Sequence, residues 1–305
     1  MRPGHRGRRL LTALALSLPL ACRDTPPVRQ FDAASAFPYL QPQVKFGPRI
    51  PGTEPHSRMA AWLDSILRQR ADTLIVQRWN HVTTRGDTLP LTNFVARFNP
   101  PAEKRILFLA HWDSRPRADG PRSTDSTVPV PGANDGASGV ALLLGVADVL
   151  KRVPPKVGVD LLFVDGEDYG DFTNTPTDVL IGSRWYAAHQ APGSPPLYAV
   201  LFDLVADKEL QIYQEGNSLV GAPEVVELVW DTAKELGHAG YFIASPRHTL
   251  IDDHLELQKA GIRAIDVVDF DYPAWHTRDD TIDKVSAASL QIVGDVAMGL
   301  VRREE

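Results

Sequence analysis

Residues 161–168 read Leu161-Leu162-Phe163-Val164-Asp165-Gly166-Glu167-Asp168, a change from four apolar residues to four acidic or small ones. The apolar half ends a run, residues 157–164, that has the length of a buried β-strand. Acidic side chains at the end of a buried strand cost free energy unless a cation or hydrogen bonds compensate their charge. The stretch therefore predicts a core strand whose carboxyl end meets a polar site.

Outward from this strand, apolar runs alternate with segments of helical period. The further predicted strands are residues 106–110, 197–202 and 262–268, and the predicted helices are residues 137–151, 223–236 and 286–302. This alternation predicts an α/β fold: a three-layer α/β/α sandwich with a central, mostly parallel mixed sheet. Ligands of such sheets bind beyond the carboxyl ends of the strands.

The composition is that of a globular protein, with 43% hydrophobic and 23% charged residues. The formal net charge is -6, and no basic stripe interleaved with aromatic residues is present. A nucleic-acid partner is therefore not expected.

The N-terminus has the pattern of an export signal. Four arginines precede an apolar run, residues 10–20, that is too short to span a bilayer. Cys22, the only cysteine, follows this run as in the lipobox of bacterial lipoproteins, although Pro19 departs from that pattern. We expect an exported protein of the periplasm or cell envelope, attached to the membrane through a lipid on Cys22, with ordinary secretion as the alternative.

The expected organisation is a signal peptide over residues 1–21, a tether over residues 22–36 and one catalytic domain over residues 37–305. The proline-containing, polar segment before Phe37 is typical of a tether. Without residues 1–21 the net charge would be about -10, which does not decide the oligomeric state. A monomer is the simpler expectation.

Several residues that bind metals or transfer protons follow the predicted strands or begin a predicted helix: His111, Asp135, Glu167, Asp168, Asp203 and His276. Each has an ordinary interpretation, such as a loop hydrogen bond for His111 or a helix cap for Asp135. Because these positions share one edge of the predicted sheet, a metal site is favoured. Adjacent carboxylates point in different directions, so Asp168 could bind the metal while Glu167 stays free to transfer protons; capping of the next turn is the alternative.

The residue types also limit the chemistry. Oxygen and imidazole ligands without a thiolate suit zinc in a catalytic site. A serine hydrolase is disfavoured because no Gly-x-Ser-x-Gly motif occurs, and no phosphate-binding Gly-x-x-x-x-Gly-Lys-Ser/Thr motif occurs either.

Taken in order, eight short motifs resemble zinc peptidase family M28, and most of all its glutaminyl cyclase branch. They are Gly47-Pro48-Arg49-Ile50-Pro51-Gly52-Thr53, His111-Trp112-Asp113-Ser114, Gly132-Ala133-Asn134-Asp135, Asp165-Gly166-Glu167-Asp168, Gly182-Ser183-Arg184, Asp203, Asp252-Asp253-His254 and Trp275-His276-Thr277. The resemblance extends from about residue 40 to the end of the chain. The order and spacing of the motifs are more specific than any one of them.

The resemblance implies a single zinc ion bound by Asp135, Asp168 and His276, with Glu167 as general acid and base. The family usually has glutamate at the position of Asp168, so the ligand here is one methylene shorter.

Two branches of the family use the same frame differently. Aminopeptidases hold a second zinc with residues like His111 and Asp203. The cyclases instead place the residue like Asp203 in a hydrogen-bonded network with a residue like Asp252. Trp275 matches the tryptophan that walls the cyclase pocket, although plain packing is the alternative for it. The expected activity is conversion of N-terminal glutamine of peptides or proteins to pyroglutamate. The alternatives are a zinc aminopeptidase and a non-catalytic peptide-binding lipoprotein.

Overall fold

The computed structural model describes residues 1, 4, 30–173, 175–190 and 195–305. The segment that contains Cys22 and most of the predicted signal peptide lies outside these residues, so export and lipid attachment stay predictions. Among the helices of the described part, none combines the length and the apolar character needed to cross a membrane.

The main sheet has six strands in the order β1-β2-β4-β3-β5-β8. Their bounds are β1 Thr73–Val82, β2 Thr88–Phe98, β3 Arg105–His111, β4 Gly158–Val164, β5 Ala199–Asp203 and β8 Ala264–Val268. The last four strands are parallel, while β1 and β2 pair antiparallel with each other and β2 pairs antiparallel with β4. A separate parallel pair consists of β6 Ile212–Gln214 and β7 Phe242–Pro246.

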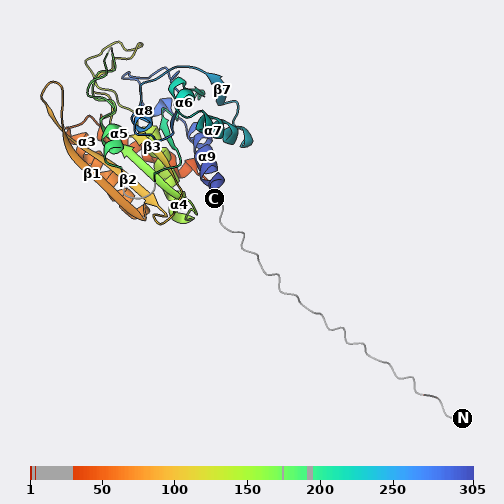
Figure 1. Cartoon of the computed structure of the whole chain (residues 1–305). Coiled ribbons are helices and arrows are strands. Elements are labelled where there is room, and N and C mark those ends of the chain that lie inside the picture. Colours follow the sequence, from red (N-terminus) through yellow and green to blue (C-terminus); the bar gives the residue numbers. More distant parts are fainter. Residues whose placement is uncertain (2–3, 5–29, 174, 191–194) are drawn as a thin grey trace.

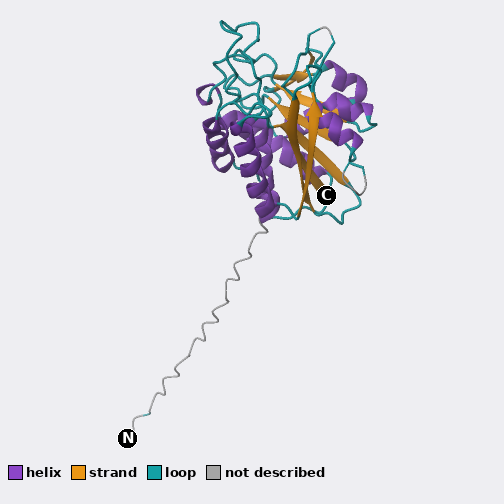
Figure 2. Cartoon of the chain, turned by 90° about the vertical axis from the view of Figure 1, so that its left-hand side faces the viewer, coloured by secondary structure: helices purple, strands orange, loops and turns teal. Residues whose placement is uncertain are grey.

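Helices cover both faces of this sheet, which confirms the predicted sandwich (Figures 1 and 2). The helices are α1 Ala33–Ala36, α2 Leu40–Phe46, α3 Glu54–Arg70, α4 Ala137–Arg152, α5 Ile181–Ala188, α6 Gly216–Gly221, α7 Pro223–Glu235, α8 His254–Lys259 and α9 Ala287–Arg303, with short 3-10 turns at Phe37–Tyr39 and Ile282–Lys284.

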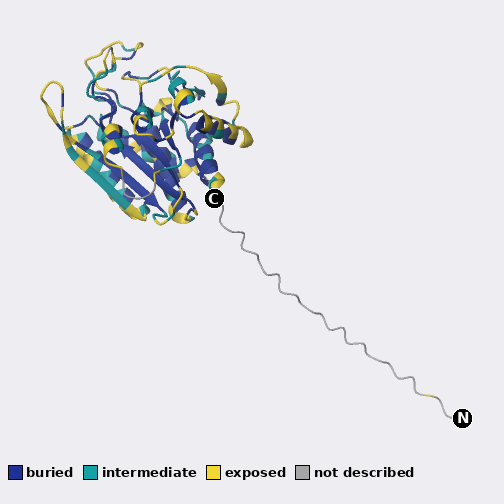
Figure 3. Cartoon of the chain, viewed as in Figure 1, coloured by how far each residue is buried: buried dark blue, intermediate teal, exposed yellow. Residues whose placement is uncertain are grey.

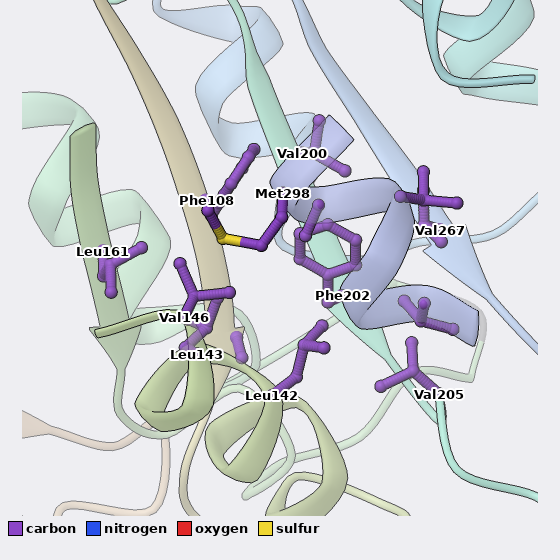
Figure 4. Packing of buried hydrophobic residues seen from close by; sticks show 14 of the residues in the cluster. Phe108, Leu142, Leu143, Val146, Leu161, Val200, Phe202, Val205, Val267 and Met298 are labelled. Carbon is purple, nitrogen blue, oxygen red and sulfur yellow. The ribbon is translucent and has the colours of Figure 1, made fainter. Parts of the chain in front are cut away.

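Strand alternation explains the two hydrophobic layers. Phe108 of β3 points to one face, where it packs in a cluster with Leu142 of α4 and Met298 of α9 (Figure 4). Its neighbour Leu107 points to the other face, where the cluster includes Tyr186 of α5 and Leu257 of α8. The central strands are thus buried on both sides, as Figure 3 shows by the dark blue sheet.

The folded part begins earlier than the boundary that the sequence analysis places at Phe37. Phe31 is buried, with 2% of its surface exposed. Its ring lies against Gly145 of α4 and Gly294 of α9, where a Cβ atom would find no room. Residues 31–36 of the expected tether therefore belong to the folded domain, because one aromatic side chain fixes them to the core.

Candidate active site

The predicted site residues meet at one edge of the sheet, where the four parallel strands end. His111 is the last residue of β3, and Asp203 is the last residue of β5. The loops after β4 and β8 carry Asp168 and His276, and Asp135 lies just before α4. In Figure 2 the loops gather at this end of the sheet.

Asp135, Asp168 and His276 form the first ligand group, which is wholly buried. The Nε2 atom of His276 lies 3.3 Å from Oδ1 of Asp168 and 3.5 Å from Oδ2 of Asp135. The Oδ2 atoms of both aspartates are buried without a hydrogen-bond partner. Buried oxygens of this kind are costly unless a cation binds them, and two carboxylates with one imidazole suit zinc. The residues present therefore fit a divalent metal ion.

His111, Asp135 and Asp203 form the second ligand group, and it shares Asp135 with the first. The Nε2 atom of His111 lies 3.2 Å from Oδ1 of Asp135 and 3.2 Å from Oδ1 of Asp203. Burial opposes the charged imidazole, but Asp113, Asp135 and Asp203 raise the pKa of His111 well above its ordinary value. His111 therefore favours its charged form in the metal-free protein, beside carboxylates that a second cation would bind.

The loop before α4 is held so that Asp135 faces both groups. The Asp280 carboxylate accepts hydrogen bonds from the backbone N–H groups of Asn134, at 2.8 Å, and Asp135, at 3.1 Å. The buried Arg49 donates to the carbonyl oxygen of Gly132 at 2.7 Å. Gly136 has a φ of 82°, and a side chain there would collide with the imidazole of His111.

Glu167 stands beside the first group without belonging to it. Its backbone N–H donates to the Asp113 carboxylate at 3.2 Å, which also accepts from the N–H of Asp168. The Glu167 carboxyl lines a cavity, with its Oε2 3.8 Å from Nδ1 of His111. Burial and the charge of Asp168 raise the pKa of Glu167 well above its usual range. A carboxyl in this state can hold a proton that it takes from a bound substrate.

Asp252 approaches the second group from the loop before α8. Burial and the negative charge of Asp203 raise the pKa of Asp252 well above its usual range. Both carboxyls line the same cavity as Glu167. Asp252 therefore favours its protonated form near Asp203.

The cavity has a volume of about 240 Å³ and two contrasting parts. Its acidic lining residues are Asp135, Glu167, Asp203 and Asp252, and its apolar ones include Phe172, Leu250, Ile251, Phe270 and Trp275. The Trp275 ring stacks on the imidazole of His276, with centroids 3.9 Å apart and planes 20° apart. A substrate with a polar reacting end and an uncharged stem suits this arrangement.

The structure brings together all eight residues that the sequence analysis places at the site, while their chemical roles stay predictions. Four supporting residues were not assigned such a role: Arg49, Arg115, Asp119 and Asp280. Arg49 lies within the Gly47–Thr53 motif, and Arg115 directly follows His111-Trp112-Asp113-Ser114. Asp119 and Asp280 have no local pattern that would have identified them.

Comparison with known proteins agrees with this fold. Residues 93–301, more than half of the chain, match peptidase family M28. The structure resembles Tannerella forsythia glutaminyl cyclase, with a TM-score of 0.86 and 34% identity, covering 90% of this chain and 100% of that one. It resembles equally a Zn-dependent exopeptidase from Parabacteroides distasonis, with a TM-score of 0.84, 32% identity and coverage of 89% and 98%. The glutaminyl-peptide cyclotransferase of Drosophila melanogaster is 24% identical over 270 residues, which are 79% of this chain and 73% of that protein.

Proposed function

The chain belongs to peptidase family M28 and is an enzyme, and we propose that it is a zinc-dependent glutaminyl-peptide cyclotransferase. The observation that carries the proposal is that Glu167, Asp252 and Trp275 line one cavity together with Asp135 and His276 of the first ligand group. The relatives named as glutaminyl cyclases support the same activity.

Asp135, Asp168 and His276 would hold one zinc ion. Zinc at this position supplies a Lewis acid for the side-chain carbonyl of an N-terminal glutamine. The tryptophan ring of Trp275 would pack against the methylenes of that side chain, so that the carbonyl points inward.

The remaining chemistry is proton transfer by the chain's own residues. The substrate's α-amine attacks the carbon of its side-chain amide, a new C–N bond closes the ring, and the old C–N bond breaks to release ammonia. Glu167 takes a proton from the amine and passes it to the leaving nitrogen. The carboxyls of Asp203 and Asp252, which line the same cavity, orient the amine and the leaving nitrogen.

A second candidate function has its own observation. His111, Asp135 and Asp203 could hold a second metal ion, and a related exopeptidase is Zn-dependent. A two-zinc site with Glu167 as base fits an aminopeptidase, which uses a zinc-activated water to release the first residue.

The test is mass spectrometry of a peptide with N-terminal glutamine after incubation with the zinc-loaded protein. Loss of one ammonia is the expected result, whereas loss of the whole first residue would identify an aminopeptidase. Glu167→Gln is the matched control, because it removes the base without changing the size of the side chain. We expect turnover to fall by about 100- to 10,000-fold with the zinc content unchanged. Equal losses of zinc and turnover would contradict the role of Glu167.

A further inference from the structure

A buried arginine, Arg115, joins two carboxylates from different segments. Its side chain is 4% exposed. Its Nη1 donates to Oδ1 of Asp168 at 2.9 Å, and its Nε and Nη2 donate to the two oxygens of Asp119 at 2.6 and 2.8 Å. The ring of Phe172 lies against the guanidinium, 5.4 Å from the centroid to Cζ. The planar fork of arginine suits such a double contact, which a lysine would not reproduce.

Asp119 in turn reaches His276. The Oδ1 atom of Asp119 lies 3.5 Å from Nδ1 of His276, on the opposite side of the ring from Asp135 and Asp168. A histidine whose Nδ1–H faces a carboxylate keeps the lone pair of its Nε2 for a metal ion.

The backbone beside Asp119 also fixes His276. The N–H of Gly120 donates to the carbonyl oxygen of His276 at 2.9 Å. His276 has a φ of 52°, a left-handed conformation that is unfavourable for a residue with a side chain. At Gly120 a Cβ atom would collide with the carbonyl oxygen of Trp275, so only glycine permits this approach.

We propose that Arg115 and Asp119 are positioning residues that set the zinc affinity of the first ligand group. Arg115 occupies Oδ1 of Asp168 and leaves Oδ2, the oxygen without a partner, for the metal. Asp119 faces Nδ1 of His276, which leaves Nε2, 3.3 Å from Oδ1 of Asp168, for the metal. With Asp135 included, the three carboxylates and one guanidinium leave two negative charges, which a divalent cation neutralises. The inference rests on the zinc site of the proposed function but does not require the cyclisation reaction.

The experiment measures the zinc dissociation constant by competition with a chromophoric chelator, together with the melting temperature of the zinc-free protein. Asp119→Asn keeps the shape but removes the charge, and Arg115→Lys keeps the charge but removes the fork. We expect zinc affinity to fall by about 10- to 100-fold in each variant. Arg117→Gln is the matched control, because Arg117 also contacts Asp119, at 3.4 Å, but is 35% exposed. It should change the affinity by less than about threefold.

Three results separate the explanations. Unchanged zinc affinity in folded Asp119→Asn and Arg115→Lys overturns the inference, even if their melting temperatures fall, because the pair would then only support the fold. If Asp119→Asn does not fold, Arg115→Lys alone decides. A wild-type protein that binds no zinc would instead refute the zinc site of the proposed function.

Discussion

The two ligand groups share Asp135 but differ in what compensates their negative charge. Asp168 in the first group is paired with the guanidinium of Arg115, a permanent positive charge. In the second group, Asp203 contacts the imidazole of His111 and lies near the buried carboxyl of Asp252. The first group thus has a permanent positive charge beside Asp168, whereas charge compensation in the second group depends on protonation of His111 and Asp252, whose pKa values are raised.

This difference bears on the number of metal ions. A cation entering the first group meets two buried oxygens that have no hydrogen-bond partner. A cation entering either group displaces a proton from its histidine, but in the second group it also lies near Asp252, whose raised pKa favours a protonated carboxyl. We therefore expect one zinc ion, in the first group, although both groups have suitable ligand types.

The most direct test of this difference is to remove the histidine that belongs to one group only, His276 in the first and His111 in the second. His276→Ala should weaken zinc binding on the order of 1,000-fold, which is more than the loss of a residue that only positions a ligand. It should also abolish turnover. His111→Ala should still bind one zinc ion. Metal analysis after gel filtration checks both variants. If His111→Ala lost a zinc ion that the wild-type protein binds, the second group would be shown to bind metal.

Asp203→Asn tests the acid of the second group. With one zinc ion in the first group, turnover should fall by about 100-fold, because Asp203 orients the reacting amine, while zinc stoichiometry stays at one. The measurement pairs steady-state kinetics with metal analysis. A drop from two zinc ions to one in this variant would support the aminopeptidase alternative.

The pH dependence of zinc binding tests whether His276 of the first group is protonated in the metal-free protein. Burial opposes the charged imidazole, but Asp168 and Asp119 raise the pKa of His276 to about 9 in the metal-free protein. Zinc requires neutral imidazole, so below this pKa each zinc bound releases a proton. Affinity should rise about tenfold per pH unit from pH 7 and level off near pH 9. Chelator competition at several pH values measures the slope; an affinity that does not change between pH 7 and 8.5 would contradict a protonated His276.

The sequence predicted the centre of the fold better than its edges. Every residue of β3 and of β4 is buried, so each strand appears as an apolar run. The strands β1 and β2 were not predicted, because the outer strand β1 is only partly buried and Pro90 interrupts the apolar pattern of β2. The amphipathic helix α3 was missed as well. Half-exposed elements carry a weaker signal, since only one side of them is selected to be apolar.

The site shows the same limit. Its candidate ligands could be predicted because each lies at a strand end or in the loop next to a strand or helix, where local sequence indicates the fold. The residues that position the ligands join distant segments. Arg115 and Asp168 are 53 residues apart in the sequence, and Asp280 and Asn134 are 146 residues apart. No local pattern encodes such pairs, because they depend on which loops the sheet brings together.

Trp275 allows the last test of the comparison, since its ring stacks on His276, the histidine of the first group. If the ring serves the substrate, Trp275→Leu should raise KM by about 2- to 12-fold, the value of one aromatic contact, and leave kcat within about twofold. Trp275→Phe, the control, should retain most of the affinity. Zinc affinity should stay within about threefold in both variants, because Asp119 still orients His276. If zinc affinity fell as far as we expect for Asp119→Asn, Trp275 would instead belong with the residues that support the metal ligands.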